Sequence, residues 1–309
     1  MPASIVKRKT ARSSERRAVS PLPAIAAAFI IALLYLIMLG ADKPLDAFGE
    51  TFRPPEKMVW CVLVAAQVAI WCYLAPPAYR RASRYASSFR GHRRAVILDL
   101  IVLVILFAIF AYAHREVTSG RKLPVAWQEA KVLPLMLLGF ATLLPCLIGM
   151  RLIAIAARAE AVADVNTAML DRFARLRADL KWFLGGAALI IGAATFTNGA
   201  FRNALNAIND PKNPLPATEV LLYGGFCSAV LGLFYLTSHE VFNGSGWALI
   251  KAVEPVLDDS ASAWADAQAR RSKLAEVMGI GTSSMRAFQD GAVILTPLAG
   301  SGVALLLGK

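Results

Sequence analysis

The chain has 309 residues, of which 57% are hydrophobic and only 17% are charged. Soluble domains carry about 25% charged and about 45–50% apolar residues, so this composition excludes an ordinary soluble protein and favours a chain that lies largely in a bilayer. The net charge of +12 would suggest a nucleic-acid partner for a soluble protein. In a membrane protein, it first indicates which ends of the spans are cytoplasmic.

Six apolar stretches approach the length of about 20 residues that a membrane-spanning helix requires. They are Leu22–Gly40, Met58–Pro76, Ala95–Ala113, Val132–Met150, Trp182–Asn198 and Val220–Ser238. The first follows a basic segment, as a signal peptide would, but its apolar core exceeds the usual length of about 7–15 residues and no cleavage site follows it. We predict an all-α, polytopic membrane helical bundle over residues 22–238, preceded by a basic and disordered tail over residues 1–21.

The basic residues are distributed unequally between the two ends of these spans. The N-terminal tail and the segments 77–94 and 151–181 each contain six Lys or Arg residues, whereas the other three connections contain nine in total. Short loops rich in Lys and Arg remain in the cytoplasm. The distribution predicts a protein of the cell inner (plasma) membrane with a cytoplasmic N-terminus.

Segment 77–94 combines arginines with aromatic residues. Its basic residues are Arg80, Arg81, Arg84, Arg90, Arg93 and Arg94. Such a mixture can bind single-stranded nucleic acid, but next to two spans the simpler partner is a bilayer with anionic headgroups. We expect lipid contact here and no nucleic-acid binding.

Few ionisable or amide groups interrupt the spans, and those that do are functional candidates because burying them in lipid is costly. Gln67 lies near the middle of the second span, where an interhelical hydrogen bond is the plainer role. Asp99 and Arg151 fall at similar depth near the cytoplasmic face, which predicts an ion pair. The alternative is a cytoplasmic gate or ion path that also includes His239 and Glu240.

Small residues recur at helical spacing in the last two spans. They are Gly185, Gly192 and Gly199 in the fifth span and Gly224, Ser228 and Gly232 in the sixth. Such faces let helix backbones approach closely. They predict either a tight hairpin of these two spans or a surface for self-association, and hence a homo-oligomer.

The tail over residues 239–290 mixes acidic and basic residues and should be cytoplasmic. Ser260 is a good helix start and Gly279 a good stop, so one helix is expected between them, and Thr282 or Ser283 would start a second. We expect this tail to be a small helical module that docks on a cytoplasmic protein partner or supports assembly.

The last segment, residues 291–309, is apolar but interrupted. Residues 292–307 carry no charge, yet Pro297, Gly300 and Gly302 break the run. These sixteen residues would cover about 24 Å as a helix, less than the hydrocarbon core of about 30 Å. We expect the segment to dock or insert partly from the cytoplasmic side. A seventh span and packing on another subunit are the alternatives.

The sequence contains none of the common phosphate-loop, zinc-helix or nucleophile-elbow motifs. We therefore expect no cofactor and no metal. The leading hypothesis is a non-enzymatic, oligomeric membrane protein that acts as a pore-like effector, sensor or assembly partner through its tail. The main alternative is a transporter or channel for a small solute or ion, and a lipid-modifying enzyme is the third class.

Overall fold

A computed structural model describes residues 22–40, 54–86, 92–119, 121–124, 128–160, 167–209, 214–255, 261–280 and 291–306. These residues form helices and contain no strand, which confirms the all-α class. The predicted disordered tail over residues 1–21, Arg90, and the second helix start at Thr282 or Ser283 lie outside the described residues.

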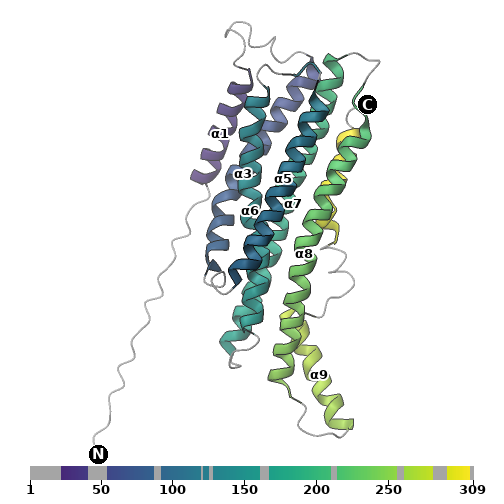
Figure 1. The fold of residues 1–309 in the computed structure, drawn as a ribbon. Coiled ribbons are helices and arrows are strands. Elements are labelled where there is room, and N and C mark those ends of the chain that lie inside the picture. The colour runs from purple at the N-terminus through teal and green to yellow at the C-terminus, as the bar shows by residue number, and fades with distance from the viewer. Residues whose placement is uncertain are drawn as a thin grey trace, which may run out of the picture.

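The helices stand side by side as an elongated bundle (Figure 1). Their bounds are Leu22–Gly40 (α1), Pro55–Ser83 (α3), Arg93–Thr118 (α5), Gln128–Glu160 (α6), Thr167–Ile208 (α7), Ala217–Val253 (α8), Ala261–Met278 (α9) and Thr296–Leu306 (α11).

Five of these helices, α3, α5, α6, α7 and α8, are long and apolar enough to cross a membrane. They contain five of the six predicted spans. The remaining span, α1, is apolar but shorter, and its 19 residues cover about 28 Å. It lies beside α3, and the Tyr35 hydroxyl donates a hydrogen bond of 2.5 Å to the carbonyl of Lys131 in α6. A membrane crossing by α1 stays a prediction.

Local sequence explains where two of the long helices begin. Pro54 is extended immediately before α3, and Pro55 is the first residue of the helix. Proline suits this position because the N–H that it lacks would have no partner within the helix. Pro216 precedes α8 in the same extended conformation. Glu56 and Glu219 place a negative charge in the first turn of each helix, where the helix dipole favours it.

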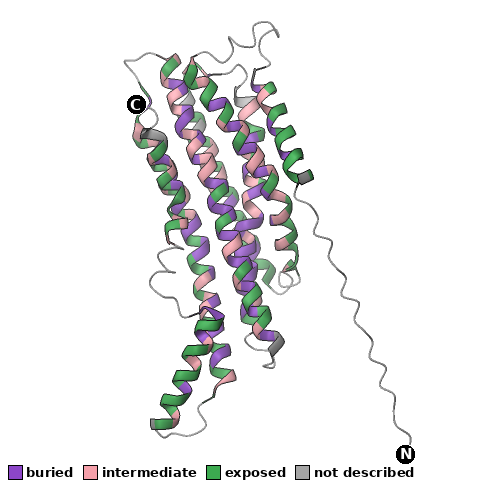
Figure 2. Ribbon diagram, turned by 180° about the vertical axis from the view of Figure 1, so that it is seen from behind, coloured by how far each residue is buried: buried purple, intermediate pink, exposed green. Residues whose placement is uncertain are grey.

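The centre of the bundle is α7, which packs against α3, α6, α8 and α11. It is the most buried of the five long helices, whereas α5 is the least buried. Close packing here depends on Gly149 of α6, because a Cβ at that position would lie 2.5 Å from the ring of Phe183 in α7. Figure 2 shows that α1, at the edge of the bundle, is largely exposed.

Residues 291–306, the C-terminal segment, pack against both α7 and α8. The contacts use the small-residue faces: the side chain of Ile294 lies against Gly232, and the Pro297 carbonyl and the Ser301 side chain lie against Gly224. The backbone N–H of Leu298 donates a hydrogen bond of 3.3 Å to the Ser228 hydroxyl. The helix that approaches these glycines is thus the chain's own C-terminal segment.

The order of these contacts places the C-terminal segment along the length of α8 and antiparallel to it. Residue 294 meets residue 232, and residue 301 meets residue 224, which lies nearer the start of α8 at Ala217. Helix α11 ends, at Leu306, near the end of the bundle opposite α9 (Figure 1). The segment is thus docked on the bundle, and its insertion from the cytoplasmic side of a membrane stays a prediction.

The helical tail contains the predicted helix, α9, which ends at Met278 and is followed by Gly279 with a positive φ of 63°. Gly279 terminates the helix in the left-handed conformation that glycine adopts readily. Ile280 then packs on Gly246 of α8, where a Cβ would lie 2.3 Å from its side chain. The predicted boundary at residue 238 is not a helix end, since α8 continues to Val253.

Candidate functional site: an aromatic cavity among five helices

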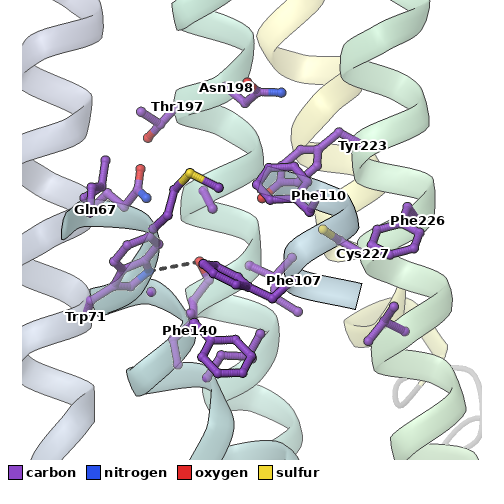
Figure 3. Close-up of a pocket in the computed structure, with 18 of the residues that line it drawn as sticks. Gln67, Trp71, Phe107, Phe110, Phe140, Thr197, Asn198, Tyr223, Phe226 and Cys227 are labelled. Carbon is purple, nitrogen blue, oxygen red and sulfur yellow. Dashed lines mark hydrogen bonds between the residues drawn. The ribbon is translucent and has the colours of Figure 1, made fainter. Parts of the chain in front are cut away.

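A cavity of about 200 Å³ lies among the five long helices, and each of them contributes to its lining. Its walls are apolar and strongly aromatic. They include Trp60, Trp71, Phe107, Phe110, Phe140 and Tyr223. Figure 3 shows several of these rings turned toward one another around the open space.

Trp71 holds three helices together at one side of the cavity. Its indole Nε1 donates a hydrogen bond of 3.0 Å to the carbonyl of Ile190, which joins α3 to α7. Its ring covers Gly139 of α6 so closely that a Cβ there would lie 2.5 Å from the ring. A glycine at position 139 is therefore what allows the indole to occupy this place.

Aromatic pairs connect the peripheral helix α5 to its neighbours. Phe107 contacts Phe140 of α6 with ring centroids 4.8 Å apart, and Phe110 contacts Tyr223 of α8 at the same separation. Both spacings fall in the range of favourable ring contacts. The side of the cavity toward α5 is thus bounded by these rings.

Gln67 of α3 is the polar residue that stands out in the lining. Its side chain is only 4% exposed, and its Oε1 has no hydrogen-bond partner among the described residues. By contrast, the lining hydroxyl of Thr197 has a partner, because it donates a hydrogen bond of 2.9 Å to the Ala193 carbonyl. A buried acceptor without a donor costs about 1–3 kcal/mol, so Gln67 marks a place where a ligand's donor would be favoured.

The sequence predicted five candidate polar residues, and Gln67 is the one of them that lines this cavity. Arg151 Nε lies 3.1 Å from Asp99 Oδ2, which confirms the predicted ion pair, although the N–H is not aligned for a hydrogen bond. His239 stacks on Tyr235, with ring centroids 5.2 Å apart, and Glu240 is exposed. The alternative prediction, a cytoplasmic gate or ion path that includes these residues, stays a prediction.

A second polar cluster joins α3 and α7 and was not anticipated from the sequence. Asp179, which is 6% exposed, accepts hydrogen bonds from Arg81 and from the Tyr85 hydroxyl, the latter at 2.6 Å. Arg84 lies 3.7 Å from the same carboxylate. Arg81 also lies over the Trp182 ring, 4.6 Å from its centroid. Burial and the bond to Asp179 raise the pKa of Tyr85, so its phenol remains a donor.

Two of the predicted headgroup residues thus have a partner within the chain. Arg81 and Arg84 pair with Asp179, although Arg84 is exposed, as are Arg80, Arg93 and Arg94. Contact of these residues with anionic lipid stays a prediction. In the sequence, Asp179 is an acidic residue next to a span, on the same predicted side of the membrane as segment 77–94. The pair could not be predicted from hairpin spacing, because α3 and α7 are not consecutive helices.

The predicted packing glycines divide into two groups. Gly192, Gly224 and Gly232 meet the C-terminal segment, as Ser228 does. Gly199 is buried, while Gly185 is exposed and a Cβ there would meet none of the described atoms within 4 Å. Four of the six predicted packing residues thus meet the chain's own C-terminal segment, and the predicted homo-oligomer stays a prediction.

No protein-family model matches the chain, and no curated protein or solved structure is significantly similar to it.

Proposed function

We propose that this multi-pass membrane protein is a non-enzymatic sensor that takes an apolar ligand from the bilayer into the aromatic cavity. The observation that carries the proposal is a cavity of about 200 Å³ with aromatic walls and the buried amide of Gln67, whose Oε1 has no hydrogen-bond partner among the described residues. Small-molecule sites are typically concave and mostly apolar, with a few placed polar groups that orient the ligand.

The lining favours an apolar ligand over an ion. A conduction path needs carbonyl, amide or charged groups that replace the hydration shell of the ion. Here the polar side chains of the lining are Gln67, Thr197, Asn198 and Tyr223, and the hydroxyl of Thr197 is already bonded within the protein. Transport of an ion or a polar solute has no comparable support.

A sensor also needs a connection from its ligand site to a partner surface. Both α7 and α8 line the cavity and continue to the region that contacts α9. There, Phe173 of α7 and Phe242 of α8 pack with ring centroids 4.3 Å apart, and Ile280 after α9 lies against Gly246. A change in the spacing of α7 and α8 at the cavity would thus reach the helical tail, which we propose presents the surface for a cytoplasmic partner.

Saturable photolabelling tests the ligand site. The full chain in phosphatidylcholine vesicles is labelled with 3-trifluoromethyl-3-phenyldiazirine, and the labelled residues are quantified by mass spectrometry. Labelling of Trp71 and Met136, which line the cavity, should saturate as the label-to-lipid ratio rises. Labelling of Phe29 and Leu34, which are 72% and 60% exposed on α1, should rise linearly. Linear labelling at all four residues would overturn the proposal.

A matched pair of variants ties the saturable component to the cavity. Ala194→Phe places a ring in the lining, whereas Leu189→Phe adds one on an exposed position of the same helix. The first should abolish saturable labelling of Trp71 and the second should preserve it. Circular dichroism and gel filtration establish that both variants fold, and equal saturable labelling in the two would contradict the assignment.

A further inference from the structure

We infer that the cavity selects a ring-bearing apolar molecule with a single hydroxyl group, a membrane-soluble phenol, and that Gln67 recognises this hydroxyl. This inference rests on the proposed function and specifies its ligand. Three observations support it: the volume of the cavity, the chemistry of its walls and the unmade hydrogen bond of Gln67.

The volume suits one ring. A dry protein cavity of about 150 Å³ is sufficient to bind benzene, and this cavity measures about 200 Å³. The space thus accommodates a substituted six-membered ring, while a longer apolar tail would have to extend toward the bilayer. A complete two-chain phospholipid is far too large for it.

The walls favour an aromatic ring over a simple alkyl chain. Trp60, Trp71, Phe107 and Phe140 reach the cavity from α3, α5 and α6, so a ligand ring meets aromatic groups from several directions. Offset and edge-to-face contacts between rings contribute about 0.5–1.5 kcal/mol beyond the burial of apolar area. An alkyl chain gains only the burial.

Gln67 favours a hydroxyl over a ketone or an ether. Its buried Oε1 has no donor among the residues that the structure describes, and a ligand hydroxyl supplies one. A hydroxyl also accepts a hydrogen bond, so it satisfies either end of the Gln67 amide. A ligand without a donor would bury the amide oxygen unpaired, which is the situation that discriminates strongly between similar ligands.

Competition against the photolabel tests the inference with two matched compounds, 4-propylphenol and 4-propylanisole. They share the ring and the alkyl group, but the anisole has a methyl ether in place of the hydroxyl. Concentrations are expressed per mole of lipid, which corrects for partitioning into the vesicles. In the unmodified chain the phenol should displace the label from Trp71 about five- to twentyfold more effectively than the anisole.

Two variants assign this preference to Gln67. Gln67→Leu keeps the size of the side chain and should bring the ratio of phenol to anisole close to one, while both compounds still displace the label. Thr142→Val removes a buried hydroxyl of α6 that bonds to the Leu138 carbonyl and lies outside the cavity lining. This control should keep the preference of the unmodified chain.

The outcomes separate the two proposals. If labelling of the cavity is not saturable in the unmodified chain, the proposed function fails and the inference fails with it. If labelling is saturable but phenol and anisole compete equally, or if Gln67→Leu retains the preference, the hydroxyl recognition is wrong while the apolar ligand site stands.

Discussion

At the scale of single residues, the Asp179 cluster shows how a charge is accommodated between two long apolar helices. Asp179 is almost fully buried and is satisfied by Arg81 and Tyr85 together. Removing one member of such a pair leaves the other charge partly buried without its counter-ion. Because Arg81 keeps about a third of its side chain exposed, water compensates for part of this loss.

Replacement of this carboxylate should therefore destabilise the protein moderately. We expect Asp179→Ala to lower the free energy of unfolding by about 1–3 kcal/mol, seen as a lower midpoint in thermal unfolding of the detergent-solubilised chain. Glu160→Ala is the control, since its ion pair with the exposed Arg172 spans 3.5 Å and such surface pairs contribute about 0–1 kcal/mol. Equal unfolding midpoints for the two variants would show that the buried pair contributes no more to stability than the surface pair.

At the scale of elements, the C-terminal segment depends on glycines that leave room for it. A Cβ at Gly224 would lie 2.7 Å from Ser301 Oγ and 2.9 Å from the Pro297 carbonyl oxygen, whereas at the neighbouring Gly225 it would meet none of the described atoms within 4 Å. Two adjacent positions of one helix thus differ sharply in their tolerance of a methyl group.

This difference predicts opposite behaviour for two alanine variants. Gly224→Ala should displace the C-terminal segment, because the carbonyl of Pro297 belongs to the backbone and cannot rotate away, and overpacking of this kind costs about 1–3 kcal/mol. Hydrogen exchange over residues 291–306 should become faster in this variant. Gly225→Ala should leave exchange unchanged, and a similar rate in both variants would argue against the docked arrangement.

At the scale of the whole molecule, the placement of the C-terminal segment bears on topology. The segment contacts α8 between residue 232 and residue 224, which is about half of the length of the sixth predicted span. We predict that α1 and the C-terminal segment both cross, in addition to the five long helices. Seven crossings would place the two termini on opposite sides of the membrane, and with the N-terminus in the cytoplasm, as the basic residues predict, the C-terminus would lie outside.

Reporter fusions test this topology. Alkaline phosphatase, which is active only after export, should be active when fused after residue 309 and inactive when fused after residue 255. Green fluorescent protein fluoresces when it stays in the cytoplasm and not when it is exported through this route. It should therefore fluoresce after residue 255 and not after residue 309. Fluorescent green fluorescent protein and inactive alkaline phosphatase at both positions would show that the chain crosses the membrane six times.

The spans themselves could be predicted because each is determined locally. A run of about 20 apolar residues is sufficient for a membrane helix, and the helix must satisfy its own backbone hydrogen bonds in lipid whatever its neighbours are. The ion pair of Asp99 with Arg151 was also predictable, since consecutive helices of a hairpin share a depth scale. The Asp179 cluster was not, because nothing in the sequence places α3 against α7.

The sequence alone determined an all-α chain with six apolar stretches, five of which are long apolar helices in the structure, and a further helix that stops before Gly279, since apolar run length and helix-stop residues act locally. Only the tertiary structure decided what the small-residue faces meet and where Gln67 points. A face of small residues indicates that another helix packs closely against it, but does not identify that helix. Here the C-terminal segment is the partner, and it lies 60 or more residues away along the chain. The cavity likewise exists only where five helices converge, because its shape is a property of their packing and of no single segment.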